Sequence, residues 1–110
     1  MKDVDLCGPG TKCPYNKSIS LIGNKWMLLI IREFMRSKKP MRFNAILDDL
    51  KPVSSKTLSS KLKELARLKI IRKQIISTTP IIATYQLTEK GKDLANVLES
   101  MKKWIVKWHD

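Results

Sequence analysis

The spacing of apolar residues predicts that the chain is mainly helical. Leu58, Leu62 and Leu65 recur at intervals of four and three, which places their side chains on one face of a helix. Ser54 or Ser55 suits the N-cap of this helix, because a short hydroxyl can accept from a free N–H group of the first turn. Similar spacing predicts earlier helices that begin near Pro14 and cover about 25–36 and 43–50.

Two β-branched stretches follow these helices and predict a hairpin. Residues 70–76 and 81–87 are rich in Ile and Thr, and the segment 77–80 separates them. A membrane or amyloid-like interpretation of the isoleucines is the alternative, but a hairpin packed on a helix is simpler. Helix, turn, helix and hairpin in this order indicate a winged helix-turn-helix. We therefore expect a mainly α fold with a small β-hairpin wing over residues 13–110, after an irregular arm at 1–12.

The expected last helix opens at Thr88-Glu89, with Thr88 as its N-cap. Its apolar residues repeat at intervals of four and three, as in a coiled-coil seam. The first helix of the same chain could cover this seam, but so small a domain has little core left, and we favour a second subunit. The expected interface, drawn from the first and last helices, comprises Ile19, Ile22, Leu94, Leu98, Met101, Trp104, Ile105 and Trp108.

Positive charge is concentrated in one segment of the chain. The formal net charge is +12, and residues 51–73 hold eight basic residues against Glu64 alone. A solvated helix face would mix Glu with Lys, so this segment favours a polyanionic partner. Cations and short hydroxyls suit phosphates and base edges in the major groove of double-stranded DNA. The candidate DNA-binding residues on this helix are Ser54, Ser55, Lys56, Thr57, Ser59, Ser60, Lys63 and Arg67.

Length and composition argue against several other classes of protein. A chain of 110 residues holds one small domain, and its longest apolar run, 26–31, falls short of the roughly 20 residues that span a bilayer. The first residues include Asp3 and Asp5 rather than the apolar core of a secretion signal. Two cysteines and the lone His109 are too few for a four-ligand zinc site, and there is no catalytic set or phosphate-binding glycine loop. We expect a cytoplasmic protein that is not an enzyme and has no metal, cofactor or membrane partner.

Several motifs occur together in this chain. They are Cys13-Pro14, Gly23-Asn24-Lys25-Trp26, Arg42-Phe43-Asn44, the run 54–65, Leu87-Thr88-Glu89-Lys90-Gly91 and Trp104. In this order they resemble the HxlR family of winged-helix transcriptional regulators, which is similar in layout to the MarR regulators. The resemblance covers about residues 13–104.

The resemblance implies a homodimeric DNA-binding regulator. The first and last helices would form the dimer, the recognition helix would cover about 55–68, and Arg42 would lie beside the helix-turn-helix. Because some family members respond to oxidants or thiol-reactive electrophiles, Cys13 is the candidate sensor. An oxidant or small-molecule effector therefore joins DNA and a second copy of the chain among the expected partners.

The sequence departs from the family pattern at three positions. Pro52 stands where the turn between the two helices usually has Gly, and Lys69 stands where the recognition helix is usually followed by Gly. Pro80 is followed by Ile81-Ile82, so the wing lacks its usual basic residue. The candidates that remain for phosphate contact near the wing are Lys73, Thr78 and Thr79.

The residues around Cys13 favour its reactive form. Cys13 lies at an expected helix N-terminus near Lys12 and Lys17, and both the helix dipole and nearby cations stabilise a thiolate. Five residues separate it from Cys7, which makes Cys7 a candidate resolving partner. The alternative is that Cys13 is a small buried residue at the dimer contact.

Two functional hypotheses follow from the sequence. The first is a sequence-specific DNA-binding transcriptional regulator that acts as a homodimer and responds to oxidation through Cys13. The alternative is a winged-helix interaction or scaffolding module that binds nucleic acid only non-specifically. The ratio of specific to non-specific affinity at fixed salt distinguishes them.

Overall fold

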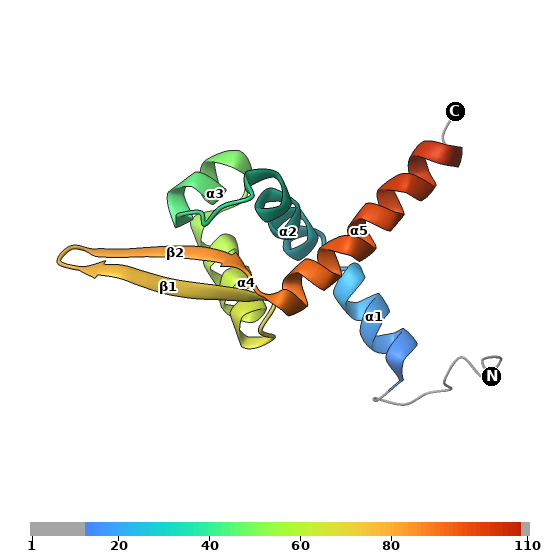
Figure 1. The fold of residues 1–110 in the computed structure, drawn as a ribbon, viewed down its shortest axis with the longest axis horizontal. Coiled ribbons are helices and arrows are strands. Elements are labelled where there is room, and N and C mark those ends of the chain that lie inside the picture. The colour runs from blue at the N-terminus through green and yellow to red at the C-terminus, as the bar shows by residue number, and fades with distance from the viewer. Residues whose placement is uncertain (1–12, 109–110) are drawn as a thin grey trace.

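The structure, a computed structural model, describes residues 13–108 apart from the side chain of Ile22. The elements in chain order are α1 (Pro14–Ile22), α2 (Lys25–Ser37), α3 (Phe43–Asp49), α4 (Ser55–Arg67), β1 (Ile71–Thr78), β2 (Ile81–Leu87) and α5 (Glu89–Trp108). The hairpin projects from one end of the molecule, and α1 and α5 extend at the opposite end (Figure 1). The predicted mainly helical fold with a hairpin wing is confirmed.

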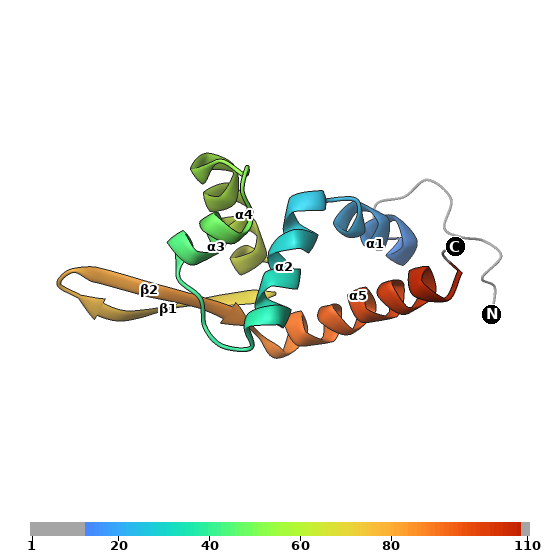
Figure 2. The same cartoon turned by 90° about the horizontal axis from the view of Figure 1, so that it is seen from above.

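Helix α2 lies at the centre of the core, between the pair α3–α4 and the long helix α5 (Figure 2). One side of α2 buries Met27, Ile30, Ile31 and Phe34, and α4 packs on it. The remaining large buried side chains come from α3, α4 and the start of the hairpin, and they are Ile46, Leu50, Leu58, Leu62, Leu65, Ile70 and Ile71. This single core holds the helix-turn-helix and the base of the wing in one unit.

Short polar side chains fix where α2 and α4 begin. The Asn24 side chain accepts from the Met27 N–H at 3.3 Å, and Ser54 Oγ accepts from the Thr57 N–H at 3.0 Å. Each contact satisfies one of the N–H groups that the first turn of a helix leaves without an intrahelical partner. The sequence predicted Ser54 or Ser55 as the N-cap of α4, and in the structure the N-cap is Ser54.

The wing is longer than the sequence indicated. Strand β1 continues to Thr78 and only two residues, Thr79 and Pro80, join it to β2, so the predicted end of the first strand at residue 76 is wrong. The strands pair antiparallel, with an irregularity in register between Ile75 and Ser77. A bridge from Met41 to Tyr85, with N···O distances of 2.9 and 2.8 Å, ties the inner half of β2 to the segment before α3.

The outer half of the wing does not pack on a helix, contrary to the expectation for its isoleucines. The side chains of Ile75, Ile76 and Ile81 are all more than half exposed. The strands reach beyond the helices that flank them, as Figure 1 shows, so only the inner part of the hairpin meets the core. Burial therefore ends where the helices end, although β-branched residues continue.

Thr88 joins α5 to the end of β2. Its Oγ1 donates to the carbonyl oxygens of Lys69 at 2.6 Å and Ile70 at 3.1 Å, and accepts from the Gly91 N–H at 3.1 Å. Thr88 thus caps α5, as predicted, and also ties the helix to the residues before β1. From this point α5 runs past α2 and then beyond the core (Figure 1). None of the described helices combines the length and apolar character needed to cross a membrane.

Candidate nucleic-acid interface

One side of α4 is anchored in the core and the other is open to solvent. Leu58, Leu62 and Leu65 are buried, which fixes the rotation of the helix. The outward side then forms a shallow hollow lined by Lys56, Ser59, Ser60, Lys63, Glu64 and Arg67. The structure therefore brings together five of the eight residues that the sequence placed on the DNA-binding helix.

The hydroxyl side chains at the start of α4 differ in role: two form the helix cap and one is exposed to solvent. Ser54 Oγ donates to Thr57 Oγ1 at 3.1 Å and also accepts from the Thr57 N–H. Both side chains are therefore engaged in the cap, which positions the helix. Ser55 follows the cap and is exposed.

Glu64 neutralises part of the positive charge on this surface. Arg67 Nε donates to Glu64 Oε1 at 3.2 Å, and its terminal nitrogen makes a closer contact with Oε2. The hydrogen bond from Arg67 lowers the pKa of the Glu64 carboxyl and raises the pKa of the guanidinium. Lys56 and Lys63, which are exposed and have no acidic partner among the described residues, supply the remaining charge of the face.

A second polar hollow lies between the start of α3 and the wing. Arg42, Asn44 and Lys73 line it together with Tyr85, and its volume is about 200 Å³. The structure thus brings Arg42 and Lys73 together, although they lie far apart in the sequence. Partial burial raises the pKa of Tyr85 above its usual value. Thr78 and Thr79 lie at the tip of the wing, where Ile81, the register partner of Thr78, also lines this hollow.

Glu33 was not recognised in the sequence as a site residue. Its side chain is 2% exposed, and its Oε2 accepts from Arg32 at 3.1 Å and from Arg36 at 3.2 Å. Helical spacing in the sequence could have identified it as a buried carboxylate, because Glu33 falls between Ile30 and Phe34 on the buried side of α2. A carboxylate at such a position needs charged partners, and Arg32 and Arg36 are within reach along the same helix.

Cys13 occupies the predicted position at the N-terminus of α1. It is the N-cap residue, its side chain is 6% exposed, and it is disulfide-bonded. Its carbonyl oxygen accepts from the Lys17 N–H at 3.0 Å. The suggested resolving partner, Cys7, lies outside the described residues.

The residues assigned to a dimer contact fall into two groups. Leu94 and Leu98 pack against the core of this protomer. The other four residues on α5 are exposed, and they are Met101, Trp104, Ile105 and Trp108. The exposed fraction of Trp104 is 63%, and Ile19 on α1 is exposed as well. The side chain of Ile22 lies outside the described part of the chain. The outer half of α5 therefore presents an apolar strip that the described residues leave uncovered.

Metal chemistry has no support in the described residues. Between Cys13 and Trp108, no group of three or more His, Cys, Asp or Glu side chains is close enough to hold an ion.

Comparison with known proteins gives one consistent answer. Residues 21–110 match the family described as HxlR-like helix-turn-helix. YodB of Bacillus subtilis, an HTH-type transcriptional regulator, is 39% identical over 95 residues, which cover 86% of this chain and 83% of YodB. YvaP of the same organism, an uncharacterised regulator of this type, is 33% identical over 99 residues and covers 89% of this chain and 90% of its own.

Solved structures agree with the sequence relatives. The reduced form of YodB has a TM-score of 0.77 at 35% identity and covers 91% of this chain and 97% of its own. YodB has also been solved after diamide treatment and with bound quinone. The redox regulator HypR in its oxidised form has a TM-score of 0.76 at 26% identity, over 89% of this chain and 99% of that one.

The family match spans most of the chain, and the relatives that support it are transcriptional regulators rather than enzymes, as the sequence predicted. The winged helix-turn-helix geometry agrees with it, because α3, α4 and the hairpin follow the expected order. This chain belongs to the HxlR-like family of helix-turn-helix transcriptional regulators.

Proposed function

We propose that the protein binds specific operator sequences in double-stranded DNA as a homodimer, with α4 in the major groove. The observation that carries this proposal is the exposed side of α4. It combines Lys56 and Lys63 with serine hydroxyls, and its one carboxylate, Glu64, is paired with Arg67. Cations suit phosphates, while short hydroxyls suit base edges.

The geometry suggests a division of roles. Ser55, Lys56, Ser59 and Ser60 lie on the first half of α4, the half that reads bases in docked helix-turn-helix proteins, and are the proposed base contacts. The proposed phosphate contacts are Lys63 and Arg67 on α4, Arg42 and Lys73 at the hollow beside the wing, and Thr78 and Thr79 at its tip. Ser54 and Thr57 position the helix through the cap.

The second half of the proposal is a two-fold dimer. Trp104, Ile105 and Trp108 on α5 are exposed, and contiguous apolar surface of this kind typically marks an interface. Ile19 on α1 adds to it at the same end of the molecule (Figure 2). A dimer through this end would leave both copies of α4 available for two half-sites.

The decisive experiment is selection of bound DNA from a random pool, with sedimentation of the free protein to give its mass. We expect a two-fold symmetric consensus and a dimer. Binding without any consensus would instead support a module that holds nucleic acid through charge alone. Residues 74–88, which include the outer part of the wing, carry no charged side chain, so binding through charge alone would have to come from α4 and the base of the wing.

Substitutions on α4 separate base reading from phosphate contact. Lys63→Ala should weaken binding to all sequences and lower the salt slope by about one. Ser59→Ala should alter the preferred sequence, at a cost of roughly 1–3 kcal/mol for a matched base. Binding isotherms on consensus and scrambled DNA at several salt concentrations give both quantities. Equal losses on both DNAs for both variants would contradict the assignment of α4 as the reading helix.

We further propose that Cys13 makes DNA binding sensitive to oxidation. Its support is the N-cap position, the disulfide at Cys13 and the resemblance to YodB and HypR, whose structures include diamide-treated and oxidised forms. Diamide takes up two hydrogen atoms as two thiols become a disulfide. Operator affinity of the reduced protein should therefore change on addition of diamide, and Cys13→Ser should abolish the change. An unchanged affinity in the unsubstituted protein would rule out this sensor.

A further inference from the structure

A small polar hollow lies at the base of the wing, on the opposite face of the hairpin from Lys73. Its volume is about 210 Å³, and the residues that line it are Phe34, Lys38, Lys39, Pro40, Arg72, Gln86, Leu87 and Lys92. Successive residues of a strand point to opposite faces of a sheet. Arg72 and its register partner Gln86 line this hollow, whereas Lys73 and its partner Tyr85 line the hollow beside α3. The two hollows are therefore separate sites.

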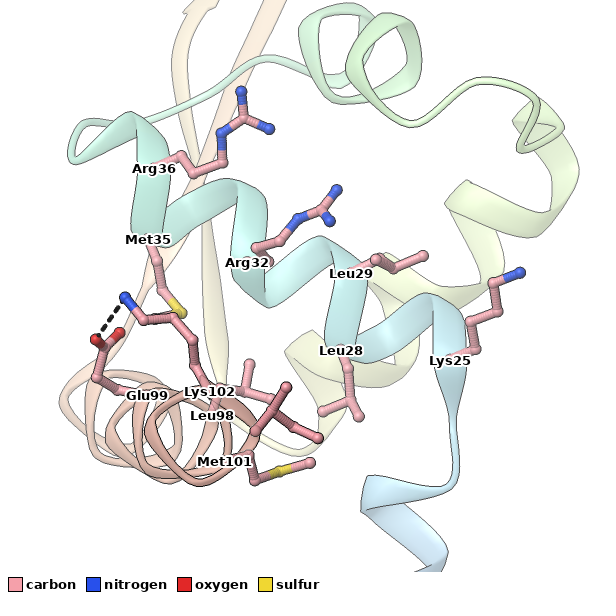
Figure 3. A pocket seen from close by; sticks show the side chains of 11 residues that line it. Lys25, Leu28, Leu29, Arg32, Met35, Arg36, Leu98, Glu99, Met101 and Lys102 are labelled. Carbon is pink, nitrogen blue, oxygen red and sulfur yellow. Dashed lines mark ion pairs between the residues drawn. The ribbon is translucent and has the colours of Figure 1, made fainter. Parts of the chain in front are cut away.

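This hollow differs in chemistry from the larger groove between α2 and α5. In that groove Leu28 and Met35 of α2 face Leu98 and Met101 of α5 (Figure 3). Met101 also belongs to the proposed dimer surface, so an apolar partner suits the groove. At the base of the wing, by contrast, four of the eight lining residues are cationic, and none is acidic. The hollow at the wing base therefore suits an anion.

Three of these cations lack an acidic partner among residues 13–108. No ion pair within the described part of the chain involves Lys38, Lys39 or Arg72. The fourth cation, Lys92, lies 3.8 Å from a carboxylate oxygen of Glu89, and both side chains are largely exposed. Like charges held close together repel one another, so the cluster costs free energy until an anion binds.

The backbone at Lys38 is a second and independent observation. Lys38 is the C-cap of α2, with φ 59° and ψ 14°, and its N–H donates to the carbonyl oxygen of Phe34 at 3.1 Å. Glycine adopts this left-handed conformation without the steric cost that a Cβ atom brings. A lysine at this position therefore adds a cation to the hollow at a cost that glycine would avoid. Residues held in this region against such a cost cluster at functional sites.

We propose that the hollow at the wing base binds a phosphate group, held by the Arg72 guanidinium and by the ammonium groups of Lys38 and Lys39. The planar guanidinium can donate to two phosphate oxygens at once, and the Gln86 amide adds a neutral donor. The volume is below the range of about 300–1,000 Å³ that is usual for larger ligands, and suits one tetrahedral anion. The phosphate belongs either to a free phosphate compound or to a DNA backbone that passes the wing base.

The first measurement uses the full chain without DNA, so its outcome does not depend on operator binding. Inorganic phosphate is titrated against the backbone amide signals in nuclear magnetic resonance spectra, with chloride at equal ionic strength as the reference. Phosphate alone should give saturable shifts at Lys38, Lys39 and Arg72. Arg72→Gln should weaken phosphate by about fivefold to tenfold, because a charge-assisted hydrogen bond is lost. Lys38→Gly should also weaken it.

Lys69→Gly is the matched control for Lys38→Gly. Lys69 is the other lysine with a left-handed backbone, at φ 62°, and it does not line the hollow. Its substitution should leave phosphate affinity unchanged. Lys38→Gly should melt no lower than the unsubstituted chain, because glycine relieves the left-handed backbone, and this separates loss of phosphate from loss of fold. Equal shifts with chloride and phosphate, or the same loss with Lys69→Gly as with Lys38→Gly, would overturn the proposal.

The second measurement identifies the source of the phosphate group. Binding of Arg72→Gln to scrambled DNA is followed across salt concentrations. A salt slope lower by about one would assign the site to the DNA backbone. An unchanged slope, together with weaker binding of inorganic phosphate, would assign it to a free phosphate compound. Unchanged values in both measurements would show that Arg72 holds no phosphate and would contradict the proposed site.

Discussion

At the scale of single residues, one carboxylate sets how much positive charge α4 presents. Glu64 is the acidic residue among those that line the exposed face, and Arg67 is paired with it. DNA phosphates must therefore compete with Glu64 for the guanidinium. Lys56 and Lys63 face no such competition from the described residues.

We predict that Glu64→Gln strengthens binding to any DNA and raises the salt slope by about one, because Arg67 becomes free for a phosphate. The Arg67 hydrogen bond holds the pKa of Glu64 below its usual value, so the carboxylate is charged throughout the neutral range. The pair would be lost only as pH falls through that lowered pKa. The variant's advantage should therefore persist at neutral pH. Fluorescence anisotropy on scrambled DNA across salt concentrations measures both effects.

Asp93→Asn is the matched control for this prediction. It removes an exposed carboxylate from α5, away from the α4 face, and changes the net charge by the same amount. An increase in salt slope as large as that of Glu64→Gln would show that net charge alone, rather than release of Arg67, explains the result.

At the scale of elements, the junction of α5 with the start of the hairpin depends on close backbone approach. A Cβ atom on Gly91 would lie 2.1 Å from the carbonyl oxygen of Ile70 and 2.9 Å from Leu87 Cδ2. The same carbonyl accepts from Thr88, through its N–H at 3.0 Å and its hydroxyl at 3.1 Å. Little room exists for the oxygen to move without breaking these bonds.

Gly91→Ala should therefore lower the free energy of unfolding by about 1–3 kcal/mol, in the range of overpacked sites. Thermal melting followed by circular dichroism measures the change. Lys92→Ala, at the next and exposed position of α5, should have little effect. If the Gly91→Ala variant were as stable as the unsubstituted chain, the junction would have to relax without cost, contrary to this account.

The sequence predicted the helices well because their signals are local. Asn24 and Ser54 cap α2 and α4, and the leucines of α4 repeat with the period of a helix. The exposure of Ile75, Ile76 and Ile81 was not predictable in this way, because a β-branched run looks the same whether or not a helix covers it.

For the candidate site, too, the sequence predicted the features that depend on local spacing and missed those that depend on tertiary contacts. The side chains that share the face of α4 could be grouped from helical periodicity, and so could the position of Cys13 at a helix start. The proximity of Arg42 to Lys73 depends on how the wing folds back beside α3, which no local pattern encodes. The Arg67–Glu64 pair lies on one helix, but its formation depends on rotamers that spacing does not determine.

At the scale of the whole molecule, charged and apolar surfaces lie at different ends. The exposed cations of α4 and the wing base belong to one end, and the uncovered rings of α5 belong to the other (Figure 1). Helix α2 connects them, since it packs against both α4 and α5. If the proposed dimer forms through α5, any change in the packing of α5 on α2 alters the separation of the two α4 helices.

Breaking the proposed dimer should therefore affect only operators with two half-sites. Trp104→Glu places a charge on the apolar strip and should yield a monomer by sedimentation, because a charge cannot be buried there without a partner. Its affinity for a two-half-site operator should fall by about 100-fold or more, because the second contact is no longer intramolecular, while affinity for a single half-site stays the same. Lys103→Glu introduces the same side chain at the preceding position and should remain dimeric. A monomeric variant that binds both operators as well as the unsubstituted protein would show that each copy recognises DNA alone.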